Sequence, residues 1–87
     1  MNVDKSDANK GVYRKFRVER TDGSSGFGGR HEHCQYFVLD CQHDPFARAA
    51  LNAYADACES QYPLLARDAR RMAEGQRIFL RYQETVR

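Results

Sequence analysis

Apolar and polar side chains alternate along the first half of the chain in a way that predicts two strands. Phe16 and Val18 fall on one side of an extended segment over residues 12–20, and charged side chains take its other side. Residues 35–41 carry apolar side chains at consecutive positions, which favours a central strand covered on both faces. A flexible, glycine-rich connection over residues 21–30 joins the two predicted strands.

Helical periodicity begins after the second predicted strand. Asp44 and Pro45 indicate a helix start, because an aspartate side chain accepts hydrogen bonds from the free backbone donors of a first turn and proline loses no hydrogen bond there. This helix is predicted to run from Pro45 to about Ser60. Its apolar stripe is formed by Phe46, Ala50, Ala53, Tyr54 and Ala57 and is widened by Leu51, Ala55 and Cys58.

A second helix is predicted over residues 63–74, with its inward side chains at Leu65, Ala69 and Met72. Gly75 is predicted to end this helix in a left-handed cap. Residues 76–87 fit two structures, because their alternation suits a third strand while a helix continuing through Gly75 also gives them an apolar side. The β-rich composition and the preceding glycine favour the strand.

These elements predict an α+β fold in the order β-β-α-α-β, in which a small antiparallel sheet packs one face against two helices. The alternative is β-β-α-α with a long C-terminal helix. Residues 1–11 have no period and are predicted to form a flexible tail, whereas residues 12–87 are predicted to form a single domain.

The length of 87 residues is near the lower limit for a self-sufficient core, so partner contacts or a homodimer are expected to supplement it. No apolar run approaches the ~20 residues of a membrane span, and a membrane partner is not expected. The first ten residues lack the apolar run of a signal peptide. A cytoplasmic location is therefore predicted.

Charge is distributed unevenly behind a net value of +2. Residues 1–30 and 63–87 are mainly basic, and residues 31–62 are mainly acidic. The basic segments can attract a nucleic acid, or they can pair with the acidic segment within the fold. We favour pairing within the fold.

The most polar cluster lies between the predicted strands and suggests a metal site. His31, His33 and Cys34 are residue types that zinc accepts. Cys41 and His43 lie beyond a strand that is on the order of 26 Å long, so one ion cannot bind both groups. The first three residues are weak metal candidates without a fourth ligand, and no cofactor is predicted.

The same region suggests two further kinds of site, a cysteine nucleophile and a phosphate-binding loop. Cys34 or Cys41 beside a histidine is a candidate nucleophile, although the three cysteines of the chain are expected to be reduced, packed thiols. The loop over residues 22–30 is a candidate for phosphate binding by backbone donors. It lacks the lysine and hydroxyl of a P-loop and leads into a predicted strand.

Several segments carry a resemblance to known proteins. They are KFRVERTDG from Lys15, GGRHEHCQYFVLD from Gly28, HDPFA from His43, AYADAC from Ala53 and YPLLA from Tyr62. On these segments, roughly over residues 15–70, the chain resembles a group of short bacterial and tailed-phage proteins of unknown function. The resemblance implies a small cytoplasmic or phage-encoded protein and transfers no functional residue.

The predicted function is that of a small non-enzymatic protein-binding module, phage- or prophage-encoded, that binds a host or phage protein. Inhibition of a bacterial defence system is one form of this hypothesis. One alternative is a nucleic-acid-binding protein that uses basic strand and helix faces, and a second is a small metal- or thiol-dependent enzyme. The candidate partner-binding residues are Arg30, His31, Glu32, His33, Arg67, Arg70 and Arg71.

Overall fold

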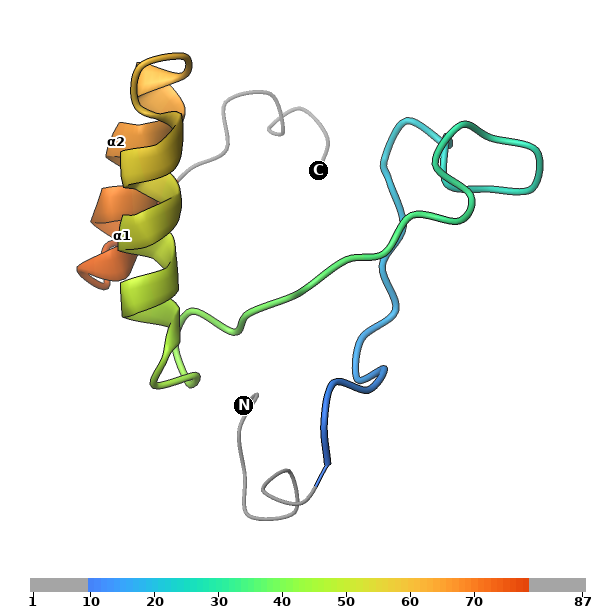
Figure 1. The fold of residues 1–87 in the computed structure, drawn as a ribbon, viewed down its shortest axis with the longest axis horizontal. Coiled ribbons are helices and arrows are strands. Elements are labelled where there is room, and N and C mark those ends of the chain that lie inside the picture. The colour runs from blue at the N-terminus through green and yellow to red at the C-terminus, as the bar shows by residue number, and fades with distance from the viewer. Residues whose placement is uncertain (1–9, 79–87) are drawn as a thin grey trace. The chain divides into compact units, whose positions relative to one another are not determined.

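The computed structural model describes residues 10–78, which fall into two compact units (Figure 1). Residues 39–78 contain two helices, and residues 10–38 consist of extended backbone and consecutive turns. Each unit has its own local hydrogen bonds.

The first unit is an antiparallel helical hairpin (Figure 1). Helix α1 spans Ala47–Cys58 and helix α2 spans Pro63–Ala73. The carbonyl of Cys58 accepts hydrogen bonds from the amides of Gln61 and Tyr62 at 3.0 and 2.8 Å, which turns the chain between the helices. Both predicted helices are confirmed: α2 begins at Pro63 as predicted, and the other ends lie within two residues of the prediction.

The hairpin has a core made of alanine. Ala55 and Ala66 are completely buried, and Ala47, Ala69 and Ala73 are nearly so. Leu51 and Cys58 pack against this cluster and are half-buried. Because alanine has no side-chain atom beyond Cβ, these positions let the two backbones approach closely while burying little apolar area.

The start of α1 differs in detail from the prediction. A carboxylate oxygen of Asp44 accepts a hydrogen bond from the Phe46 amide at 2.8 Å, and the Asp44 carbonyl accepts one from the Ala47 amide at 3.1 Å. Asp44 therefore forms a turn that precedes the helix, and Phe46 is the capping residue. The aspartate still satisfies a backbone donor just before the first turn of α1.

Gly75 ends α2 as predicted. Its φ of +88° is in the left-handed region, its amide donates to the Met72 carbonyl at 3.0 Å, and the Gln76 amide donates to the Arg71 carbonyl at 2.9 Å. These two bonds are those of a Schellman motif. The alternative of a long last helix is therefore wrong, because α2 stops at Ala73.

The α+β fold class is wrong, because no strand forms within residues 10–78. The segments predicted as strands, residues 12–20 and 35–41, have no strand partner there. Most of their apolar side chains are exposed, from 37% at Val38 to 90% at Val12, whereas Leu39 is half-buried. High strand propensity does not make a strand without neighbouring chains and a covered face. Of the predicted third strand, residues 76–78 are irregular and the remainder lies outside the described residues.

The absence of a sheet from the described residues changes which side of each helix is covered. The predicted inward stripe of α1 is largely exposed, with Tyr54 at 54% and the adjoining Phe46 at 66% exposure. Leu65, predicted to point inward from α2, is 43% exposed. Neither α1 nor α2, the helices of residues 10–78, could cross a membrane.

Replacing Gly75 with alanine tests the cap. Gly75→Ala should lower the free energy of unfolding by about 1–2 kcal/mol, because a Cβ is disfavoured at a positive φ. Urea unfolding followed by helical circular dichroism measures the effect. Gly11→Ala is the control, since Gly11 has open space around its Cβ position and no positive φ. Equal losses in the two variants would contradict the role of the left-handed cap.

Candidate functional site

Residues 20–34 form a succession of hydrogen-bonded turns. The carbonyls of Arg20, Gly23 and Gly26 each accept a hydrogen bond from the amide three residues later, at 3.1, 3.1 and 2.8 Å. A longer connection closes the segment, in which the His31 amide donates to the Ser24 carbonyl at 2.8 Å. The segment predicted to be a flexible connection therefore has a defined internal path, which we call the turn segment.

Gly29 is required because the backbone at this position lies against the backbone of Ser24. A Cβ at this position would collide with the backbone carbonyl of Ser24, and backbone cannot move aside as the end of a side chain can. The close approach at Gly29 lies two residues before His31. It thereby helps to hold the hydrogen bond between the His31 amide and the Ser24 carbonyl.

Several of the backbone amides considered for phosphate binding already donate hydrogen bonds within the turn segment. The Gly28 amide donates to a carboxylate oxygen of Glu32 at 3.0 Å, and the Ser24 amide donates to a carboxylate oxygen of Asp22 at 3.0 Å. The amides of Gly23, Gly26 and Gly29 donate to backbone carbonyls. An anion would have to displace two carboxylates and break several turns, so the geometry does not favour this candidate.

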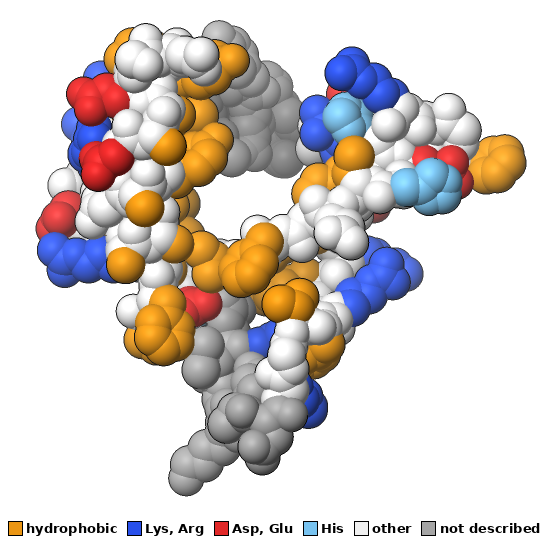
Figure 2. Space-filling view, viewed as in Figure 1, with side chains coloured by type: hydrophobic (Ala, Val, Ile, Leu, Met, Phe, Trp, Pro, Cys, Tyr) orange, Lys and Arg blue, Asp and Glu red, His pale blue; other side chains and the backbone are white. Residues whose placement is uncertain are grey.

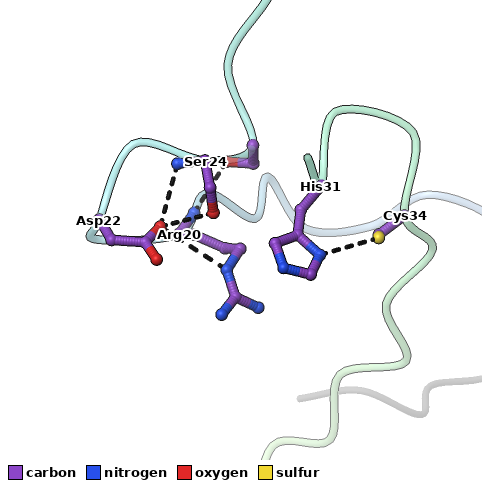
Figure 3. Close-up of polar contacts among 6 residues, drawn as sticks. Arg20, Asp22, Ser24, His31 and Cys34 are labelled. Atoms are coloured by element: carbon purple, nitrogen blue, oxygen red, sulfur yellow. Dashed lines mark hydrogen bonds and ion pairs between the residues drawn. The ribbon is translucent and has the colours of Figure 1, made fainter. Parts of the chain in front are cut away.

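Asp22 is the most highly bonded carboxylate of the turn segment (Figure 3). The Ser24 hydroxyl donates to it at 2.6 Å, and Arg20 Nε lies 3.7 Å away. The hydroxyl and amide of Ser24 lower the pKa of Asp22 below its usual value, and the charges of Arg20 and then His31 lower it further. Sequence reasoning gave Asp22 no role of its own, because it treated residues 21–30 as a flexible, glycine-rich connection.

The three weak metal candidates do not converge. His31 Nδ1 lies 3.2 Å from Cys34 Sγ, as Figure 3 shows. His33 lies against a different group, with its Nε2 3.6 Å from a carboxylate oxygen of Glu32, and its side chain is 90% exposed. In the part of the chain that the structure describes, no three His, Cys, Asp or Glu side chains are placed to hold a metal ion.

The second cysteine–histidine candidate is arranged differently. His43 Nδ1 lies 3.1 Å from a carboxylate oxygen of Asp40, and the same carboxylate accepts from the backbone amides of Gln42 and His43. The Cys41 thiol contacts the Leu39 carbonyl at 3.9 Å. The imidazole of His43 is therefore oriented toward a carboxylate, and Cys34 with His31 is the thiol–imidazole pair of the described residues.

The arginines of α2 have unequal surroundings. Arg70 Nη2 lies 2.8 Å from Asp56 and 3.1 Å from Glu59, and these hydrogen bonds raise the already high pKa of the guanidinium. Arg67 lies 3.5 Å from Asp68, whereas Arg71 is exposed and has no ion pair with any residue in the range 10–78. A further pair, Arg48 with Glu74 at 3.2 Å, also joins the two helices.

The charged and apolar residues of the hairpin occupy opposite sides. Successive residues of a helix are rotated by about 100°, which separates Ala50 and Tyr54 of α1 from the ion-paired Asp56. Figure 2 shows charged side chains along one edge of the hairpin and apolar side chains along the other. We define the apolar hairpin face by its exposed members, which are Phe46, Ala50, Tyr54, Ala57 and Leu65.

The sequence predicted most residues of this face but not that they would be exposed. The predicted stripe of α1 includes Phe46, Ala50, Tyr54 and Ala57, but a sheet was expected to cover it. The helix α2 instead covers the neighbouring positions Leu51, Ala55 and Cys58. The candidate residue Arg30 is exposed on the turn segment, beside the half-buried His31 and Glu32. Its side chain forms no hydrogen bond or ion pair with the described residues.

No protein-family model, no curated protein and no solved structure matches this chain.

Arg70→Gln should lower the melting temperature of the hairpin, because it removes the ion pairs with Asp56 and Glu59. Arg71→Gln is the matched control: it removes the same charge from the next residue, which has no ion pair among the described residues. Thermal circular dichroism should show a loss only for Arg70→Gln. In about 1 M salt the loss should shrink, since screening weakens exposed pairs. Indistinguishable variants would contradict a stabilising role for these pairs.

Ser24→Ala should raise the pKa of Asp22 toward the ordinary value of 3.8. Since the folded pKa is the lower one, ionised Asp22 stabilises the turn segment above pH 3.8, and this contribution is lost as the pH falls through the folded pKa. A carbon-13 NMR titration of the Asp22 carboxyl measures the shift. Ser60→Ala, in the connection between the helices, should leave it unchanged. An ordinary value in the unaltered protein would contradict the structure of this turn.

Proposed function

We propose that this chain is a non-enzymatic protein-binding module that docks its apolar hairpin face onto another protein. The observation that carries the proposal is the exposure of two aromatic side chains and a leucine, Phe46, Tyr54 and Leu65, on one side of the hairpin. An exposed apolar patch bordered by charged residues is typical of an interaction surface. Within residues 39–78, the helical unit itself leaves these three side chains 66%, 54% and 43% exposed.

Burial energetics support a protein partner. Transfer of apolar surface out of water contributes about 25 cal/mol per Å², and large aromatic side chains often dominate interface energies. The hairpin's own core buries alanines and has no completely buried large side chain among the described residues. A partner that covers Tyr54 and Leu65 would therefore add apolar burial that the hairpin itself lacks, and it would stabilise the helices through binding.

The shape and charge of the surface suggest how recognition would occur. The apolar hairpin face runs along α1 with the spacing of four residues between Phe46, Ala50 and Tyr54, which suits an apolar groove on a partner. Arg71 is exposed on α2 and can steer a partner with an acidic rim. The proposed partner is a host or phage protein, and a component of a bacterial defence system is one such protein.

The nucleic-acid alternative has less support from the geometry. It depends in part on three arginines of α2, and the central one, Arg70, is held by Asp56 and Glu59. Ion pairing with two carboxylates reduces the positive charge that α2 offers to phosphates. The thiol- or metal-dependent enzyme alternative depends on the turn segment, where only the pair of His31 and Cys34 is assembled.

Two double variants, each of which introduces two negative charges, test the proposal. Tyr54→Glu combined with Leu65→Glu places two carboxylates on the apolar hairpin face, whereas Ser60→Glu combined with Gln61→Glu places them in the connection between the helices. The tagged full chain is used to retain proteins from a bacterial lysate. A retained protein is identified and purified, and its affinity for each variant is measured by calorimetry.

The unaltered chain and the control variant should bind the same protein, and the face variant should bind at least tenfold more weakly, since an interface hot spot contributes more than about 1 kcal/mol. Circular dichroism must show equal helix content in both variants. Equal affinities, or retention of no protein, would overturn the proposal. Sedimentation of the isolated chain distinguishes a second copy of the chain from another protein as the occupant of the face.

A further inference from the structure

Cys34 differs from the other two cysteines in its exposure and its neighbour. Its side chain is exposed, whereas those of Cys41 and Cys58 are partly buried. Its Sγ lies 3.2 Å from Nδ1 of His31, a distance at which a thiol proton can pass to an imidazole nitrogen. Neither of the other thiols has a histidine nitrogen at this range among the described residues. Cys34 is therefore both accessible to solvent and next to a group that can accept its proton.

The backbone of the turn segment holds this pair together. The Cys34 amide donates to the His31 carbonyl at 3.2 Å, which closes the turn between the two residues. The His31 amide is itself bonded to the Ser24 carbonyl at 2.8 Å, next to the close approach that requires Gly29. His31 is half-buried as a result. The imidazole position is thus set by the fold of the segment, while the sulfur stays open to solvent.

Two charged side chains, Asp22 and Arg20, lie on the same segment as the imidazole of His31. Asp22 and Arg20 lie in the same part of the turn segment, as Figure 3 shows. Ser24 and Arg20 have the larger effects on the pKa of Asp22, and positive charge on His31 lowers this pKa further. The Asp22 carboxylate is therefore near enough to attract a protonated imidazole of His31. Glu32 is occupied by the Gly28 amide and lies near His33. The positive charge created when the imidazole takes a proton thus has an anionic neighbour.

We propose that Cys34 is a site of thiol–disulfide exchange with small-molecule disulfides, and that His31 is the positioned base that accepts the thiol proton. This inference is independent of the apolar hairpin face, because every residue that carries it belongs to the turn segment.

The exchange step balances without another reactant. The Cys34 proton passes to His31 Nδ1, and the sulfur anion attacks one sulfur of a disulfide R–S–S–R. A bond forms between Cys34 Sγ and that sulfur as the original sulfur–sulfur bond breaks. The departing thiolate takes the proton from His31, so the products are a mixed disulfide on Cys34 and one molecule of R–SH. Cys34 is oxidised, and half of the small-molecule disulfide is reduced.

The mixed disulfide is the expected end product because the turn segment contains no second cysteine. Cys34 is the only cysteine between residues 10 and 38, and the other two belong to the helical unit. Resolution into an internal disulfide would need a thiol from that unit. A small external thiol can reverse the reaction, which makes the modification reversible.

The test uses the full chain, reduced and then mixed with glutathione disulfide. Intact mass follows addition of one glutathionyl group, and peptide mapping locates it. Cys34 should react at least about tenfold faster than Cys41 and Cys58, a factor below the ~10²-fold typical of a positioned general base. His31→Gln should slow modification of Cys34 about tenfold without changing the rates of the other two. His33→Gln, which changes the neighbouring histidine, should leave all three rates unchanged.

A second variant, His31→Asn, guards against a disturbed turn in His31→Gln, and both should slow the reaction equally. Equal rates for the three cysteines would overturn the proposal. So would an unchanged Cys34 rate in both His31 variants, or slowing of the same size in His33→Gln. Formation of an internal disulfide, detected as a mass loss without a glutathionyl group, would overturn the assignment of the end product.

Discussion

Close packing of alanines between α1 and α2 is the constraint on which the helical unit depends. Ala55 and Ala66 are completely buried, so the helices meet through their smallest side chains. Leu51 and Cys58 pack at the edge of this contact, whereas Tyr54 and Leu65 lie outside it and are 54% and 43% exposed. Because the helices meet through the alanine positions, α1 and α2 leave the apolar hairpin face uncovered.

The edges and ends of the hairpin are stabilised by polar interactions that complement a small core. Arg70 pairs with Asp56 of α1 and with Glu59, the residue that follows α1, and the Schellman bonds at Gly75 satisfy carbonyls in the last turn of α2. The Arg70 pairs lie on the side of the hairpin away from Tyr54, and the Schellman bonds lie at the end of α2. The charged side therefore contributes ion pairs to the hairpin itself, whereas Tyr54 and Leu65 remain exposed on the other side.

The turn segment obtains its order from hydrogen bonds instead of a core. Its turns, the Ser24 bonds of Asp22 and the close approach at Gly29 define a path without any buried large side chain. This path brings His31 and Cys34 together across three residues. The two proposed activities, docking and thiol exchange, thus arise from different kinds of local structure, apolar contact in one case and backbone hydrogen bonding in the other.

The sequence by itself determined the features whose causes are local. Helix spacing, Pro63 and Gly75 define the helices, because caps and periodicity act within a few residues. Tertiary structure alone decided which arc of α1 is buried, since Leu51 and Ala55 are covered only through the position of α2. The prediction of a strand at residues 35–41 was wrong, because a strand also needs a neighbouring strand to pair with, and strand propensity alone does not provide one. The pairing of His31 with Cys34 likewise required the path of the backbone, since residues three apart meet in a turn and separate in a strand.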